Sequence, residues 1–222
     1  MGTYAEMRTR IADELANDGD ISTAQINNAI QSTIADYAGE QFWFNEAVST
    51  FSTVANQELY TSSDLAAIPS IIKILSVRTN NSNAWNGYIN GITNDQIEDI
   101  QDGSIIGTPN YYARFANKIR LYPIPDAAYT IKISYIATLT ALSADSDTNA
   151  WTEDAEEVIR QGAKRRLAAD ILASDEIANR CAAMEKAAYE GLRAENRNRR
   201  SQQLLRTEVP QGRTVFNIYN GW

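Results

Sequence analysis

The sequence predicts an α+β fold that is mainly an α-helical bundle, with two N-terminal helices, two long C-terminal helices, an inserted small antiparallel β region and an extended C-terminal arm. Apolar residues recur at helical spacing near both ends, and apolar and polar residues alternate in the middle third. A break at Pro210 and Gly212 precedes an apolar end. The expected domains are the N-terminal helical hairpin (1–45), the β region with loops and a short helix (46–142), the long C-terminal helices (152–205) and the arm (206–222).

Two capping boxes mark the N-terminal helices. Thr3 with Glu6, and Ser22 with Gln25, have the spacing at which each side chain bonds the other's backbone amide at a helix start. Apolar stripes at helical spacing follow each box: Met7, Ile11 and Leu15 in the first helix, and Ile26, Ile30, Ile34 and Tyr37 in the second. We expect two antiparallel helices joined by a short turn at "NDGD".

The middle third reads as strands separated by turns. "VSTFSTVANQELYT" and "SIIKILSVRT" are rich in residues that fit a pleated surface, whereas "NNSNAWNGYING" (80–91) has the composition of a loop. A short helix capped by Thr93 and Gln96 is expected next, followed by a hairpin around Asn117. In "AYTIKISYIA" apolar residues alternate with polar ones, which is typical of a half-exposed strand: Tyr129, Ile131, Ile133 and Tyr135 share one face.

The chain is predicted to return to helix at Thr152, taken as an N-cap. Ser174 is the expected cap of a last helix that runs from about Asp175 to Leu205. That helix would be roughly 45 Å long at about 1.5 Å per residue, more than one compact domain needs to cover its core. Its expected apolar seam is Ile177, Cys181, Met184, Ala188 and Leu192.

Composition removes several classes of function. The chain contains no histidine and a single cysteine, which excludes Ser-His-Asp and Cys-His catalysis, histidine zinc sites and thiolate clusters. No apolar run approaches the roughly 18 residues of a membrane span, and the N-terminus lacks the apolar centre of a secretory signal. No catalytic constellation is visible, so we expect a protein that is not an enzyme and uses no cofactor.

A calcium-binding loop is one candidate within "DSDTNAWTEDAE". Its carboxylates and amide, at Asp145, Asp147, Asn149 and Glu156, occupy positions one, three, five and twelve of such a loop. The sixth position is Ala150 where the turn requires glycine, and a strand precedes the loop where a helix is usual. A polar loop that leads into a helix is therefore the favoured interpretation.

Charge is distributed unevenly. Residues 1–159 carry 8 basic and 21 acidic side chains, whereas residues 160–222 carry 12 basic and 7 acidic ones. The basic end contains "KRR" and "RNRR", which offer phosphate contacts. Because the clusters are short, a solvated helix face or ion pairs between subunits are favoured, and these roles fall on Arg193, Arg197, Arg199 and Arg200.

Aromatic and thiol groups are interpreted as core. "FWF" (42–44) lies between a helix and a strand, where an aromatic anchor is commoner than a platform for stacking bases. Cys181 lies in an apolar seam and is expected to pack rather than to react.

Several segments together resemble phage head-to-tail adaptor proteins, which form the ring below the portal in short-tailed phages. They are "YAEMRTRIADEL", "IQSTIADYAGEQFWFNEA", "RLYPIPDAAYTIKISYIATLTALS" and "TNAWTEDAEEVIRQGAKRRLAADIL", and the resemblance covers about Thr3 to Leu172. The order of these segments carries the resemblance, and "YPIPDAAYTI" is its most specific part.

The resemblance implies a helical bundle with an inserted β region, assembled as a dodecameric ring around the DNA channel in the neck of the virion after synthesis in the host cytoplasm. The implied partners are the portal protein, a tail nozzle or tail-tube protein, further copies of the chain and, without sequence specificity, the genomic DNA. A C-terminal arm that binds the portal or a neighbour falls on residues 206–222, with these contact residues: Arg213, Val215, Phe216, Ile218, Tyr219 and Trp222.

Two other functions stay open from the residues alone. A DNA-binding module would use the Arg-rich last helix and would bind with steep salt dependence. A carboxylate-based hydrolase acting on cell-wall glycans has no support beyond the abundance of acidic residues.

Overall fold

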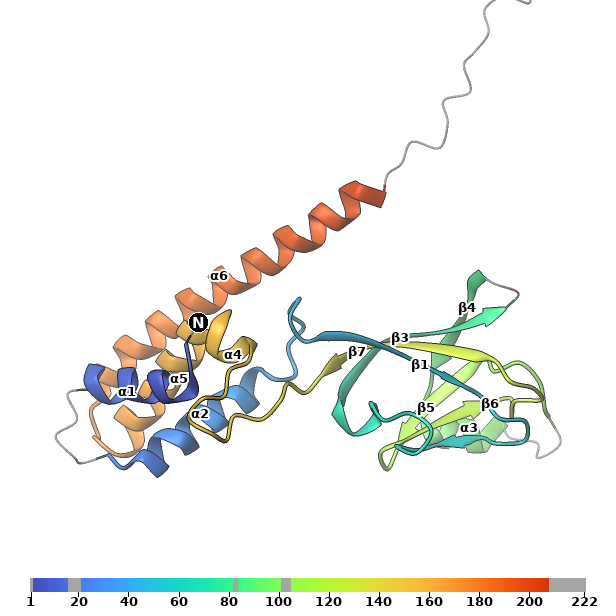
Figure 1. Ribbon diagram of the computed structural model, residues 1–222, viewed down its shortest axis with the longest axis horizontal. Helices are drawn as coiled ribbons and strands as arrows, with labels where there is room; N and C mark the ends of the chain where they lie inside the picture. Colours follow the sequence, from blue (N-terminus) through green and yellow to red (C-terminus); the bar gives the residue numbers. More distant parts are fainter. Residues whose placement is uncertain (1, 16–20, 82–83, 101–104, 208–222) are drawn as a thin grey trace, which may run out of the picture.

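The computed structural model describes residues 2–15, 21–81, 84–100 and 105–207, and in Figure 1 its helical bundle and its sheet lie at opposite ends of the molecule. The helices are α1 (Tyr4–Glu14), α2 (Thr23–Tyr37), η1 (Ile68–Ser70), α3 (Asn94–Ile100), α4 (Ala150–Glu153), α5 (Glu156–Asp170) and α6 (Asp175–Thr207). The strands are β1 (Glu46–Ser52), β2 (Leu59–Tyr60), β3 (Ile71–Asn81), β4 (Ala84–Gly91), β5 (Tyr111–Phe115), β6 (Lys118–Tyr122) and β7 (Thr130–Ala137).

Both predicted capping boxes are confirmed. The Thr3 hydroxyl accepts from the Glu6 amide at 3.2 Å, and Glu6 accepts from the Thr3 amide at 2.9 Å. Ser22 and Gln25 repeat the arrangement at the start of α2. Each helix then buries the predicted stripe, because residues three and four apart share one face. The stripe residues Met7 and Ile11 in α1 and Ile26 and Ile30 in α2 are buried, and Leu15, Ile34 and Tyr37 are partly buried.

From Ala150 to Thr207 the chain is mainly helical, as predicted, but one predicted cap and one predicted seam position are wrong. Asn149, and not Thr152, is the N-cap of α4. Thr152 is the third residue of that helix, and its hydroxyl accepts a hydrogen bond from the Asn149 amide. In α6, Cys181 and Leu192 are buried as expected, whereas Met184 is 48% exposed. Glu185 takes the seam position, four residues after Cys181, because a partner on α5 neutralises its charge there.

All seven strands belong to one sheet, in the order β1-β7-β3-β4-β5-β6-β2. The two ends of this order are consecutive in sequence, since residues 53–58 alone separate β1 from β2. Phe51 of β1 contacts Tyr60 of β2 with ring centroids 4.9 Å apart. The sheet is therefore curled around its own apolar interior, and Figure 1 shows this curvature.

The prediction of a mainly helical bundle with a small β region is wrong, because the β part is a full seven-stranded curled sheet. The predicted loop 80–91 contains β4, which pairs with β3 from Val77↔Ile89 to Asn81↔Ala84. Gly87 is needed in this pair, because a Cβ there would lie 2.4 Å from the Thr79 methyl. The sheet is also not wholly antiparallel, because β4 and β5 pair in parallel at Asn90 and Gly91.

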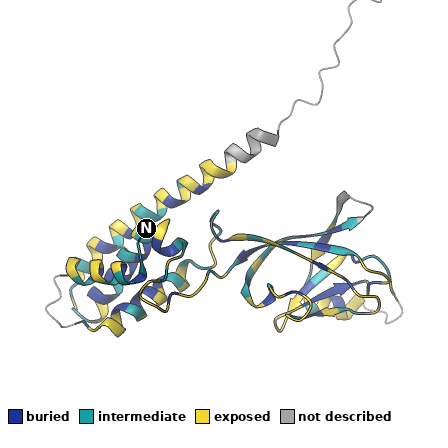
Figure 2. Ribbon diagram, viewed as in Figure 1, coloured by how far each residue is buried: buried dark blue, intermediate teal, exposed yellow. Residues whose placement is uncertain are grey.

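Two main cores stabilise the molecule. One lies between the helices, and the other lies inside the curled sheet, with Phe51, Tyr60, Val77, Ile119 and Ile133 among its buried side chains. A small third cluster joins α3 to the outer side of β5 and β6. Figure 2 shows the buried residues inside both ends of the molecule and exposed residues along the outer side of α6.

An aromatic cluster fills the junction between bundle and sheet, and the prediction for "FWF" as a core anchor is confirmed at Phe42. Phe42 is 1% exposed, stacks on Phe44 and meets Trp151 and Tyr189 edge to face. Asn45 is also buried and turns the chain from α2 into β1, because its side chain accepts from the Phe42 amide and donates to the Glu40 carbonyl.

Candidate interaction surfaces

The distal half of α6 lies across the junction between bundle and sheet. Asn196 donates to the Gln41 carbonyl at 2.8 Å, and Arg200 forms an ion pair with Glu46 at 3.2 Å. The helix has 33 residues, so it spans about 50 Å at about 1.5 Å per residue. It therefore covers the bundle, reaches the first strand and ends at Thr207, beyond the other helices in Figure 1.

The arginines of this half-helix contact side chains of their own protomer. Arg199 bonds Glu195 one turn earlier at 2.6 Å, and its guanidinium lies 4.2 Å from the centre of the Trp43 ring. Arg193 lies 5.6 Å from the Tyr189 ring. Arg197 is exposed and makes no ion pair among the described side chains. Three of the four predicted interface residues, counting Arg200, are thus engaged within the chain, and a role between subunits stays a prediction.

A buried carboxylate fixes α6 against the bundle. Glu185 accepts from the Arg165 guanidinium of α5 at 2.6 Å and from the Tyr37 hydroxyl of α2 at 2.7 Å. Burial, followed by the bond to Glu185, raises the pKa of Tyr37, so this hydroxyl remains a donor at any physiological pH. The bond to Glu185 likewise raises the pKa of Arg165.

Sequence reasoning missed this network, although its periodicity was visible. Glu185 lies four residues after Cys181 and seven before Leu192, both of which are buried. A charged residue at a seam position indicates a buried partner, because an unpaired charge there would be strongly destabilising. The partner itself was not predictable, since it comes from another helix.

The candidate calcium loop serves the N-terminus of α1 instead. The Asp147 and Asp145 carbonyls accept from the Tyr4 and Ala5 amides at 2.9 and 3.1 Å. The Asp147 carboxylate accepts from the amides of Ser143 and Ala144, and these bonds lower its pKa. No group of three or more acidic or thiol side chains that would hold a metal gathers within the described part of the chain.

The other candidate ligands of that loop have separate partners. Asp145 forms an ion pair with Arg8, and the Asn149 side chain caps α4. Glu156 bonds Arg160 at 3.0 Å and Arg10 at 3.2 Å. The structure therefore gives each predicted ligand a role in helix capping or charge pairing, and the calcium interpretation has no support.

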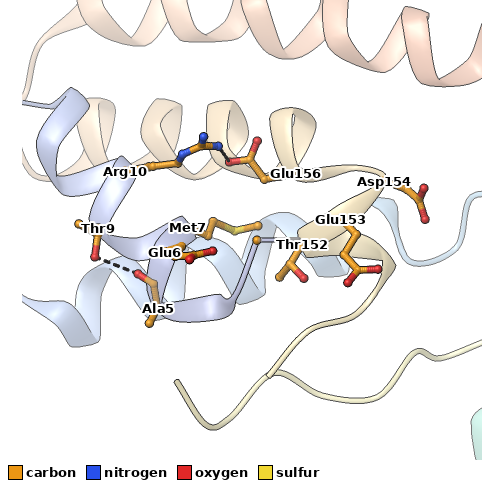
Figure 3. Close-up of a pocket in the computed structure, with 10 residues that line it drawn as sticks. Ala5, Glu6, Met7, Thr9, Arg10, Thr152, Glu153, Asp154 and Glu156 are labelled. Carbon is orange, nitrogen blue, oxygen red and sulfur yellow. Dashed lines mark hydrogen bonds and ion pairs between the residues drawn. The ribbon is translucent and has the colours of Figure 1, made fainter. Parts of the chain in front are cut away.

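An open groove of about 970 Å³ lies between α1 and α4 (Figure 3). Glu6, Glu153, Asp154 and Glu156 make its lining acidic, with Arg10 as the basic side chain. Figure 3 shows Arg10 directed to Glu156 across the groove, while Glu153 and Asp154 point outward. Glu6 is engaged with Thr3 in the capping box. Two of its four acidic side chains, Glu6 and Glu156, thus have partners within the chain.

Exposed apolar side chains gather on the sheet-bearing half. Of the eleven large hydrophobic side chains exposed among the described residues, only Met184 lies in the bundle. The most exposed are Tyr88 at 61%, Phe115 at 60% and Val48 at 57%, from three different strands. Exposed apolar residues are normal when they are scattered, and here they divide unequally between the two halves of the molecule.

Three further predictions concern burial, membranes and the arm. Cys181 is buried, so packing is its confirmed role. Among the residues that the structure covers, no helix combines the length and apolarity needed to cross a membrane. The predicted arm residues Arg213, Val215, Phe216, Ile218, Tyr219 and Trp222 lie outside the described residues.

Comparison with known proteins gives one family. The family model described as SU10 adaptor protein matches residues 2–211, nearly the whole chain. A search of curated proteins finds no match. The family match confirms the resemblance to phage head-to-tail adaptors. The chain belongs to the SU10 adaptor protein family.

Proposed function

We propose that the protein is a structural, non-enzymatic component of the virion neck, which forms a ring joining the portal to the tail around the DNA exit channel. The observation that carries the proposal is the family match over residues 2–211. A dodecamer is the expected ring, assembled in the host cytoplasm. Its partners are the portal protein, the tail nozzle or tail-tube protein and further copies of the chain. The role needs no cofactor.

The two halves of the molecule suit this role differently. The bundle closes on itself through ion pairs and a buried network, so it supplies a rigid support. The sheet-bearing half exposes most of the apolar side chains, as expected of a surface that meets other subunits. A closed ring requires one surface of each subunit to meet a different surface of the next.

We assign the contact with the portal or an adjacent subunit to the arm. Residues 213–222 carry five large apolar or aromatic side chains and one charge, a composition that favours burial against another molecule. Ordering an arm costs about 1–2 kcal/mol per residue in backbone entropy, which burial of its aromatic side chains must offset.

Deletion of residues 213–222 tests this assignment. All described helices and strands precede this segment, so the shortened protein should keep the circular dichroism spectrum and melting temperature of the full chain. It should fail to co-sediment with portal rings. A variant in which the ten residues are replaced by a Gly/Ser sequence of equal length separates the chemistry of the arm from its length. Unchanged binding of the deleted protein to the portal would refute the assignment.

The DNA-binding alternative is less well supported by the structure. Arg193, Arg199 and Arg200 already contact aromatic or acidic side chains of the protomer, which reduces their availability to phosphates. Gel shifts at two salt concentrations distinguish the proposals, because phosphate binding weakens steeply with salt.

A further inference from the structure

The sheet contains a gap one strand wide between β3 and β5. In the strand order β4 lies between them, and it pairs with β3 from Val77 onward and with β5 only at Tyr111 and Tyr112. β4 ends at Gly91, after which the chain turns into α3. Residues 71–76 of β3 and 113–115 of β5 consequently have no partner strand on this side within the described residues. We call this gap the β3–β5 lane.

The lane is a groove with apolar side chains on both strands, beside the polar side chains of Lys73, Thr93, Asn94, Asp95 and Arg114. Its volume is about 580 Å³, and its lining includes Ile72 and Ile74 from β3, Ile92 at its closed end and Phe115 from β5. Phe115 is 60% exposed. Unpaired strand edges beside exposed apolar side chains form a template for another strand, and proteins normally cover such edges.

Arg114 shows that a backbone acceptor points into the lane. Its guanidinium, on β5, donates to the Ile72 carbonyl of β3 at 2.9 Å. The Arg114 side chain is exposed. Its guanidinium donates to the Ile72 carbonyl the hydrogen bond that the backbone amide of a neighbouring strand would ordinarily donate. The lane therefore presents hydrogen-bonding groups as well as apolar side chains.

The dimensions fit one added strand. At Gly91, β4 lies between β3 and β5. These two strands are therefore two strand spacings apart at that point, about 9.6 Å. A strand entering the lane beyond Gly91 would hydrogen-bond to β3 on one side and β5 on the other. Alternate side chains would face the apolar lining, which is the usual geometry of peptide recognition by strand addition.

We propose that the β3–β5 lane of each subunit receives residues 213–222 of a neighbouring copy as an added strand. This segment, "RTVFNIYNGW", carries a single charge and the apolar and aromatic residues that favour strands. The lane is lined by Lys73, Arg114 and Asp95, and the segment's one charge is Arg213 at its first position, so the apolar residues that follow carry the fit. Residues 208–212 link the end of α6 to this segment and span up to about 17 Å when extended.

The assignment to a neighbouring copy rests on the proposed ring. The β3–β5 lane and residues 213–222 are different surfaces of one chain. If the lane of each copy binds this segment of the next copy, the contact is head-to-tail, as a closed ring needs. The portal contact tested by deletion would then depend on a ring that these segments hold together.

Peptide binding to the full-length protein tests the lane without any portal. A fluorescein-labelled peptide of residues 213–222 should bind saturably, as measured by fluorescence anisotropy. Phe115→Glu should weaken this binding at least tenfold, because it places a charge against an apolar strand. Val48→Glu is the matched control, since Val48 is 57% exposed on β1, an edge strand that β7 separates from β3. Absent binding, or equal binding to wild type and Phe115→Glu, would overturn the proposal, as would loss with Val48→Glu alone.

Disulfide trapping tests the source of the segment. Full-length Phe115→Cys and Ile218→Cys proteins, mixed and oxidised, should yield a product of twice the chain mass, whereas Met184→Cys with Ile218→Cys should not. The native Cys181 is buried and gives no background. The neighbouring-copy assignment would be overturned if the mixture gave no dimer and a protein carrying both substitutions formed the disulfide within its own chain. Neither experiment depends on the portal, so their failure is distinct from failure of the proposed function.

Discussion

The bundle and the sheet differ in how many large apolar side chains they leave exposed, and the difference indicates where each acts. In the bundle, charged side chains pair across helices, as Lys164 does with Glu14 at 2.6 Å and Arg165 with Glu185. Among the described residues, the sheet-bearing half instead leaves ten large hydrophobic side chains exposed and the β3–β5 lane without a strand. A unit whose charged side chains are paired within the chain is suited to support. A unit with unpaired strand edges and exposed apolar side chains is suited to assembly.

The comparison is tested most strongly by truncating one aromatic residue in each half. Phe42→Ala removes the centre of the junction cluster and should lower the free energy of unfolding by about 3–5 kcal/mol. Phe115→Ala removes an exposed ring and should change it by less than about 0.5 kcal/mol. Urea denaturation measures both. A large loss from Phe115→Ala would show that this side chain stabilises the isolated chain.

The next largest effect is expected at the buried carboxylate. Glu185→Ala leaves the Arg165 guanidinium and the Tyr37 hydroxyl without their acceptor, and should cost about 2–4 kcal/mol. Glu190→Ala, on the exposed side of the same helix, is the control and should cost less than about 0.5 kcal/mol. Equal melting temperatures for the two variants would mean that the network contributes little.

A pair of glycines tests how closely the helices pack. A Cβ at Gly162 would lie 2.5 Å from the Thr33 methyl and 2.8 Å from Glu185 Oε1, so Gly162→Ala should destabilise by about 1–3 kcal/mol. At Gly191 a Cβ meets nothing within 4 Å, and Gly191→Ala should stabilise α6 by about 0.5–1 kcal/mol. Melting temperatures that move in the same direction for both would contradict the packing.

The smallest expected effect is on the stability of the protein at acid pH. Burial alone would raise the pKa of Glu14, but hydrogen bonds from Lys164 and Arg160 outweigh it and hold the pKa below its ordinary value of 4.5. Because the folded-state pKa is depressed, its stabilising contribution is complete above about pH 4.5 and is lost as the pH falls through the folded pKa. Glu14→Gln should therefore flatten the fall in melting temperature below that pH. An unchanged pH profile would exclude this contribution.

Prediction from sequence succeeded where the determinants are local. Both capping boxes lie within four residues, and the hairpin turn at Asn117 has the positive φ that asparagine tolerates. Prediction failed where a distant partner decides. β4 forms from a segment with loop composition because β3 pairs with it, and Glu185 rather than Met184 is buried in the seam because Arg165 lies opposite.

The candidate interaction surfaces divide in the same way. The resemblance to adaptor proteins was readable in the order of sequence segments, and the family match confirms it. The four arginines were identified as a cluster. The partners Trp43 of Arg199 and Glu46 of Arg200 precede them by some 150 residues and were not predictable. The β3–β5 lane had no sequence signal, because it results from the end of one strand between two others.

The sequence by itself determined the long helices, the capping boxes of the N-terminal helices, most strands and the family, because these depend on periodicity and on contacts between near neighbours. Only the tertiary structure decided that seven strands curl into one sheet, that Glu185 is a buried link and that β3 and β5 stand one strand apart. Those features depend on pairs of residues far apart in the chain, and no local pattern specifies which distant backbone or charge will lie opposite.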